Sequence, residues 1–208
     1  MNRVLDTLGN VPVTNSVIGS LFPEIKSKNN KVAELEKAGY CIRLKRGLYV
    51  ISPEITHQAL STELIANHLY MPSYISMQSA LRYYGLIPER VFTMQSVTFK
   101  PNRTFENSLG RFEYIHTSRE TFAVGITYIA ADQFSFLIAT PEKALCDLVA
   151  STRAINLRYI NETKAFLFED LRLNEEAFYE MRPEIFRQYA ATGKKARSIE
   201  TIIKVLEQ

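Results

Sequence analysis

The sequence predicts an α+β protein in which a small N-terminal domain precedes a larger mixed domain with a helical tail. The first fifty residues contain two short amphipathic segments and then an alternating apolar and basic stretch. The middle contains several short runs rich in β-branched and aromatic residues, and the last quarter has helical apolar spacing. A chain of 208 residues accommodates one large or two small domains. We therefore expect domains over residues 1–52 and 61–208, the second ending in helices from about residue 155.

The small N-terminal domain is expected to hold three helices. The first is short, at about residues 3–8, and the second can start at Thr14, whose hydroxyl can accept a hydrogen bond from a free backbone N–H group. The third can start at Ser27 and end at Gly39, because glycine readily adopts the left-handed conformation that closes many helices. Its first turn is Lys28-Asn29-Asn30-Lys31 rather than the acids that the helix dipole favours there, which indicates a role other than helix stability.

The stretch Tyr40–Val50 alternates apolar and basic side chains around an Arg46-Gly47 turn, which predicts a two-stranded hairpin with a basic face. Helix, turn, helix and basic hairpin in this order are typical of a winged helix-turn-helix, whose second motif helix enters the major groove of DNA while the wing contacts phosphates. The predicted DNA-binding residues lie in the first turn of the third helix and in the hairpin: Lys28, Asn29, Asn30, Lys31, Arg43, Lys45 and Arg46.

The distribution of charge supports a polyanionic partner at the N-terminal end. Residues 1–52 hold eight Lys and Arg against four Asp and Glu, whereas the remaining residues hold 17 against 18. A basic head on a near-neutral body fits binding to double-stranded DNA. The alternative is a small helical cap whose charges are merely solvated, as most charge runs are.

The body is expected to follow a linker between Ser52-Pro53 and Ser61. A helix capped by Ser76 and ended by Gly85 precedes a small, mostly antiparallel sheet. Turn residues, including Asp132-Gln133, separate its expected strands: Val91–Lys100, Arg111–His116, Phe122–Ala130 and Phe134–Ile138. The next helix starts at Thr140-Pro141, and the helices of the tail are expected near residues 160–168, 174–181, 183–191 and 198–207.

No catalytic residue, metal site or cofactor is predicted, so we do not expect an enzyme. The histidines are widely separated in the sequence, and no glycine-rich phosphate loop is present. Cys41 and Cys146 lie in apolar surroundings typical of reduced core thiols. Glu142, Lys143 and Asp147 could support metal-assisted nuclease chemistry, but a first-turn charge for Glu142 and a helix-surface acid for Asp147 explain them better.

A cytoplasmic protein without a membrane partner is expected. The N-terminus lacks the apolar run of a signal peptide, and no stretch approaches 18 uninterrupted apolar residues. Ordinary globular composition, with 46% hydrophobic and 23% charged residues, argues against disorder.

Three sequence blocks in order resemble a known family: Ile42–Val50, Pro72–Leu81 with Tyr84–Glu89, and Ile138–Leu148. Together they are similar to the AbiEi-type antitoxins of type IV toxin–antitoxin systems in abortive infection, also described as predicted transcriptional regulators of viral defence. The resemblance covers about residues 10–150 well and the helical tail loosely. The short first helix departs from the family pattern.

The resemblance implies a bacterial cytoplasmic protein with two functions. Its winged helix would repress its own operon by binding inverted repeats in double-stranded operator DNA. Its C-terminal region would counter a nucleotidyltransferase toxin without forming a stable complex with it. A standalone winged-helix regulator whose body senses a ligand or dimerises is the alternative, and an enzyme acting on nucleic acid is a third possibility.

Overall fold

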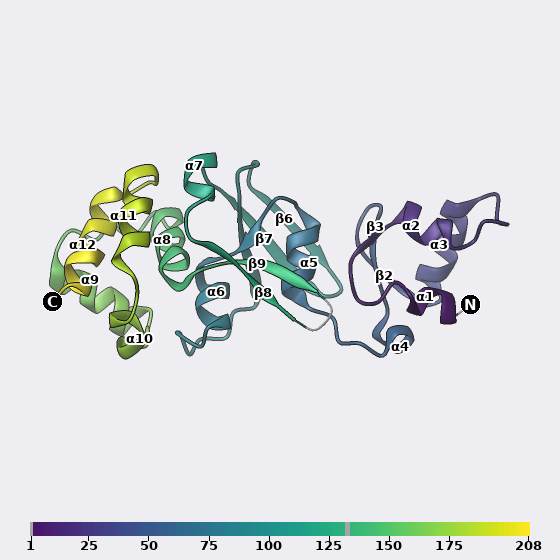
Figure 1. The fold of residues 1–208 in the computed structure, drawn as a ribbon, viewed down its shortest axis with the longest axis horizontal. Coiled ribbons are helices and arrows are strands. Elements are labelled where there is room, and N and C mark those ends of the chain that lie inside the picture. Colours follow the sequence, from purple (N-terminus) through teal and green to yellow (C-terminus); the bar gives the residue numbers. More distant parts are fainter. Residues whose placement is uncertain (1, 132–133) are drawn as a thin grey trace.

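The computed structural model describes residues 2–131 and 134–208, so the turn predicted at Asp132-Gln133 lies outside the described residues. The molecule is elongated and has three parts in a row. The N-terminal helices and hairpin lie at one end, a six-stranded sheet lies in the middle, and the C-terminal helices lie at the other end (Figure 1). The predicted α+β class is confirmed.

The N-terminal part combines short helices with a three-stranded antiparallel sheet of order β1-β3-β2. Its elements are α1 (Asn2–Asp6), β1 (Val13–Thr14), α2 (Asn15–Ser20), α3 (Lys28–Lys37), β2 (Cys41–Lys45), β3 (Leu48–Ile51) and α4 (Pro53–Thr56). As predicted, Thr14 accepts a hydrogen bond from the backbone N–H of Val17, and Gly39 follows α3 with a φ of 77°. The segment expected to be a linker contains α4, whose Ile55 packs into the N-terminal core.

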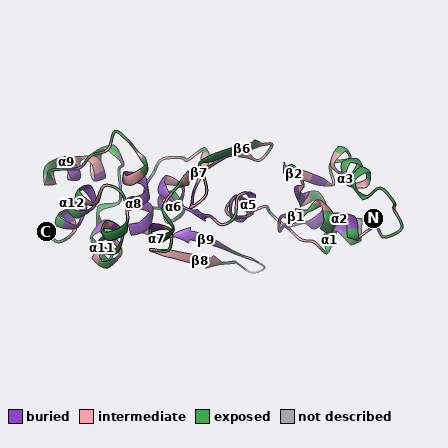
Figure 2. Cartoon of the chain, turned by 90° about the horizontal axis from the view of Figure 1, so that it is seen from above, coloured by how far each residue is buried: buried purple, intermediate pink, exposed green. Residues whose placement is uncertain are grey.

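The hairpin of β2 and β3 lies between two hydrophobic cores. Cys41, Tyr49 and Ile51 pack with the N-terminal helices. The hairpin side chains that join the core of the body are Leu44, Leu48 and Val50. Every residue of β3 is buried, whereas much of α3 is exposed (Figure 2). The hairpin therefore contributes side chains to both cores and joins the N-terminal part to the body.

The central sheet is more mixed than predicted. Its elements and the neighbouring helices are α5 (Thr62–Leu69), β4 (Tyr74–Ile75), α6 (Met77–Tyr83), β5 (Thr93–Thr98), β6 (Arg103–Asn107), β7 (Gly110–His116), α7 (Arg119–Phe122), β8 (Ile126–Ala130) and β9 (Ser135–Ala139). The strand order is β6-β7-β5-β4-β9-β8, with β5–β7 and β4–β9 parallel and the other three pairings antiparallel. The strand predicted to start at Phe122 starts instead at Ile126, because Phe122 ends the short helix α7, which Ser118 caps through the backbone N–H of Thr121.

The long helix α8 (Pro141–Ser151) lies between the sheet and the C-terminal helices (Figure 1). Thr140 caps it through the backbone N–H of Lys143, and residues 142–149 are all buried. The tail elements are close to the predicted ranges: α9 (Ile160–Lys164) with a π-helix (Ala165–Asp170), α10 (Glu175–Tyr179), α11 (Pro183–Thr192) and α12 (Ala196–Leu206). Within the described residues, none of the helices is both long and apolar enough to cross a bilayer.

Candidate nucleic-acid interface

The first turn of α3 presents polar side chains to solvent, beside the turn of the hairpin. Asn15, the first residue of α2, donates its Nδ2 to Oδ1 of Asn29 at 2.5 Å. The backbone N–H of Asn15 donates to the carbonyl oxygen of Gly47 at 3.1 Å. These two bonds hold the starts of α2 and α3 against the hairpin turn. We call the resulting polar group the head surface: Asn15, Lys28, Asn29, Asn30 and Arg46.

Two of the predicted DNA-binding residues are instead paired with acids of their own domain. Lys31 forms an ion pair with Glu34 at 2.9 Å, and its side chain is only 12% exposed. Arg43 donates from Nε and Nη2 to Oε2 of Glu36 at 3.1 and 2.5 Å, and this hydrogen bond raises the pKa of Arg43. Since the neighbouring carboxylate offsets part of the charge of each side chain, Lys31 and Arg43 are weaker candidates for phosphate contacts than the cations of the head surface.

The predicted wing residue Lys45 points toward the body. Its Nζ donates to the carbonyl oxygen of Leu69, at the end of α5, at 2.5 Å and lies 5.7 Å from the ring centroid of Phe105. Burial lowers the pKa of Lys45, and the positive charges of Arg103 and Lys100 lower it further. Lys45 is therefore part of a basic group in which two of the three cations belong to the body.

This group was missed in the sequence because β6 was not predicted. Lys100 donates to the carbonyl oxygen of Met71, and its Nζ lies 5.2 Å from the ring centroid of Tyr70. The guanidinium of Arg103 lies 4.8 Å from the centroid of Phe105 and 5.6 Å from that of Tyr70. The alternation of polar and aromatic residues at Arg103, Thr104 and Phe105 is the sequence pattern that could have indicated a strand here. We call this group the junction cluster: Lys45, Tyr70, Lys100, Arg103 and Phe105.

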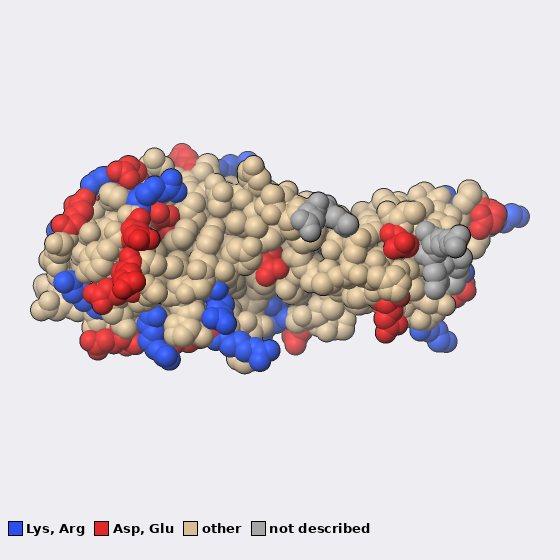
Figure 3. All heavy atoms as spheres, turned by 60° about the horizontal axis from the view of Figure 1, so that its bottom comes forward, with Lys and Arg blue, Asp and Glu red and all other residues tan. Residues whose placement is uncertain are grey.

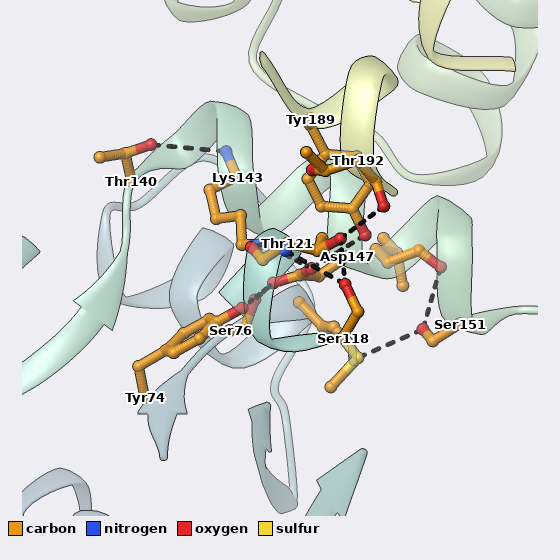
Figure 4. A network of polar contacts seen from close by, with 12 residues as sticks. Tyr74, Ser76, Ser118, Thr121, Thr140, Lys143, Asp147, Ser151, Tyr189 and Thr192 are labelled. Atoms are coloured by element: carbon orange, nitrogen blue, oxygen red, sulfur yellow. Dashed lines mark hydrogen bonds and ion pairs between the residues drawn. The ribbon is translucent and has the colours of Figure 1, made fainter. Parts of the chain in front are cut away.

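A buried polar network lies on α8, in the block that resembles the antitoxin family (Figure 4). Asp147 Oδ1 lies 3.2 Å from Lys143 Nζ and accepts from the Tyr189 hydroxyl at 3.1 Å. Asp147 Oδ2 accepts from the Tyr74 hydroxyl at 3.0 Å and from Ser76 Oγ at 2.8 Å. Lys143 is 0% and Asp147 3% exposed. The interpretation of Asp147 as a helix-surface acid is thus wrong, and Ser76 bonds to Asp147 rather than capping α6.

The network joins four elements of the body. Lys143 Nζ also donates to the carbonyl oxygen of Thr121 at 2.7 Å, so β4, α7, α8 and α11 are tied together. Burial lowers the pKa of Lys143 and raises that of Asp147, and in each case the charge of the partner opposes the shift. The donors of this chain occupy both carboxylate oxygens of Asp147. No group of three metal-ligating side chains occurs among residues 2–131 and 134–208.

A cavity of about 470 Å³ lies beside this network, between the sheet and the C-terminal helices. Asp147 and Tyr189 contribute to its wall, together with the basic side chains of His116, Arg153 and Lys194. On the face drawn in Figure 3, basic and acidic side chains are mixed over the helical end, which fits the near-neutral charge of the body.

Comparison with known proteins identifies the fold but no family. No family model matches the chain, and no curated protein matches it. The crystal structure of the RV2827C protein from Mycobacterium tuberculosis is similar, with a TM-score of 0.57 and 11% sequence identity. The match covers 95% of this chain and 73% of that chain. The two proteins therefore share a fold across nearly the whole chain described here.

Proposed function

We propose that this protein is a winged-helix DNA-binding repressor of its own operon, and that it is also the antitoxin of a type IV toxin–antitoxin system. The observation that carries DNA binding is the exposed first turn of α3 beside the hairpin turn with Arg46. The order α1-β1-α2-α3-β2-β3 with the sheet β1-β3-β2 supports the proposal, because a winged helix-turn-helix combines a helix pair with a hairpin in this order. Asn29 and Asn30 suit adenine edges, Lys28 suits guanine, and Arg46 suits a phosphate.

The antitoxin part of the proposal is supported by the three ordered blocks that resemble the AbiEi-type family. These blocks form the hairpin, the segment from β4 through α6, and the segment from β9 into α8. The third block contains Lys143 and Asp147, which hold the body together. The proposed setting is the bacterial cytoplasm, with a nucleotidyltransferase toxin that is countered without a stable complex, and without catalysis by this chain.

The DNA-binding proposal is tested by fluorescence anisotropy with a duplex of about three helical turns from the region upstream of the coding sequence, and with a scrambled duplex of equal composition. If two copies each neutralise about three to five phosphates, log K against log salt should have a slope near −5 to −9. Arg46→Ala should weaken binding to both duplexes, whereas Asn29→Ala or Asn30→Ala should reduce the preference between them. Equal affinity of the wild type for both duplexes would contradict the role of α3.

The antitoxin proposal is tested by growth of cells in which a neighbouring nucleotidyltransferase gene is induced. The full chain should restore growth, and so should a Lys28→Ala/Arg46→Ala variant that no longer binds DNA, if the body counters the toxin by itself. A variant that fails to restore growth while remaining folded would show that neutralisation depends on DNA binding.

A second candidate function, a regulator that responds to a small ligand, is favoured by the cavity beside Asp147 and Tyr189. The neighbouring gene discriminates the two. A nucleotidyltransferase-like gene supports the antitoxin, and its absence supports the standalone regulator.

A further inference from the structure

We propose that the junction cluster is a second phosphate-binding site, formed jointly by the hairpin and the body, that holds the backbone of the same DNA duplex beside the head surface. The inference rests on the proposed DNA binding and extends it to residues beyond the N-terminal part. Its cationic members are Lys45, Lys100 and Arg103.

A continuous series of contacts connects α3 to this cluster. Asn29 bonds to Asn15, and the backbone of Asn15 bonds to Gly47 in the hairpin turn. Lys45 lies two residues before Gly47 in that hairpin and packs over Phe105 of β6. The guanidinium of Arg103 lies over the same Phe105 ring. The head surface and the junction cluster are therefore connected through the hairpin, which contributes residues to both.

The junction of hairpin and body is built on two adjoining edge strands. β2 is the edge of the small sheet and β6 is the edge of the large sheet. Nδ2 of Asn107 on β6 donates to the carbonyl oxygen of Leu44 on β2 at 3.1 Å. Since backbone and core side chains from both parts meet here, the cations of the cluster hold a fixed position relative to α3 before any ligand binds.

Among residues 2–131 and 134–208, no acid is paired with the charges of the cluster. None of the ion pairs formed by described residues includes Lys45, Lys100 or Arg103. Lys45 gives one N–H group to the carbonyl oxygen of Leu69, the last residue of α5, and Lys100 gives one to the carbonyl oxygen of Met71, just beyond that helix. Two donors remain on each ammonium group. The exposed guanidinium of Arg103 makes no side-chain hydrogen bond to a described residue, so its fork remains available for the bidentate contact that phosphate accepts.

The aromatic rings explain how three cations can be held together without a carboxylate. The ring faces of Tyr70 and Phe105 lie under the charged groups, and cation–π attraction together with the partial negative charge at the end of α5 offsets part of their repulsion. A phosphate would offset the rest. A backbone phosphate of duplex DNA is the anion that the continuity with the head surface favours.

The test uses the full chain and a Lys100→Gln/Arg103→Gln variant, which keeps polar side chains of similar length over the rings. Both duplexes described above are titrated at several salt concentrations. Loss of two phosphate contacts should make the salt slope less steep by about 1.8 per bound copy and should weaken binding to both duplexes alike. The conservative Arg103→Lys variant should keep most of the slope, because the charge remains.

The matched control removes the same charge at the far end of the molecule. Lys194→Gln/Arg197→Gln, around the start of α12, should leave the slope unchanged (Figure 1). Two results would overturn the inference and leave the proposed function standing. One is an equal change of the salt slope in the two double variants. The other is an unchanged slope in the cluster variant while the wild type prefers the upstream duplex. A wild type that binds neither duplex would overturn both. Thermal unfolding by circular dichroism verifies that each variant is folded.

Discussion

Replacing Asp147 by alanine should destabilise the protein strongly without touching the DNA-binding surface. The change removes the only ion-pair partner of Lys143 among the described residues. It also removes the acceptor of three hydroxyl groups: Tyr74, Ser76 and Tyr189. Removing one member of a buried ion pair typically costs about 3–5 kcal/mol, and each buried donor left without a partner costs about 1–3 kcal/mol.

We expect Asp147→Ala to lower the free energy of unfolding by at least about 4 kcal/mol, since these costs overlap and do not simply add. For a chain of this size that loss lowers Tm by about 8–16 °C. A Lys143→Met/Asp147→Asn variant should lose less than Asp147→Ala, because no charge remains in the buried site. Its asparagine oxygen still accepts one or two of the hydroxyl groups.

The loss should also depend on pH in a defined direction. Burial lowers the pKa of Lys143, and Asp147 partly restores it, so in the Asp147→Ala variant the pKa of Lys143 falls further. A lysine whose pKa is lowered in the folded state does not destabilise the fold above its ordinary pKa of 10.5, where it is neutral in both the folded and the unfolded chain. As the pH falls toward the lowered pKa, the unfolded chain binds the proton more readily than the folded chain, so stability is lost. The difference between wild type and variant should therefore shrink as the pH rises from 7 toward 10.

Urea unfolding followed by circular dichroism at several pH values measures these free energies. A loss below about 1 kcal/mol for Asp147→Ala would refute the assigned role of the network, given that buried unpaired ammonium groups are costly. So would a double variant that is less stable than Asp147→Ala, because the argument depends on the cost of the isolated charge.

Further predictions concern the core of the body, the head surface and the contact between the hairpin and the body. Gly125→Ala should cost about 2–4 kcal/mol in urea unfolding, because its φ is 60° and a Cβ would lie 2.8 Å from that of Lys143. Lys28→Ala should weaken duplex binding more than Lys31→Ala in anisotropy titrations, because Lys31 is already paired; equal losses would contradict this. A chain starting at Ser61 should be less stable to urea than the body within the full chain, because it loses the hairpin side chains that cover the core of the body.

Much of the local structure followed from the sequence. The cap at Thr14, the helix end at Gly39 and the start of α8 at Thr140 are confirmed. Each depends on hydrogen bonds and backbone conformations within about four residues, so the local sequence carries the information. The tail helices were predictable for a similar reason, since apolar spacing along a helix is also local.

The surroundings of individual charges were decided by tertiary structure. Asp147 has the spacing of a helix-surface acid, but its partners Tyr74 and Tyr189 lie 73 and 42 residues away in the chain. Lys45 alternates with apolar neighbours as a wing residue would, yet it bonds to Leu69.

The sequence by itself determined the α+β class, several of the helix starts and the hairpin with its basic residues. Only the tertiary structure decided that Lys31 and Arg43 are paired with acids, that β6 forms an edge strand, and that the hairpin is buried between two cores. The physical reason is the range of the interactions. Caps and turns are stabilised by neighbours in the chain, whereas the burial and pairing of a charge depend on which distant segments pack against it.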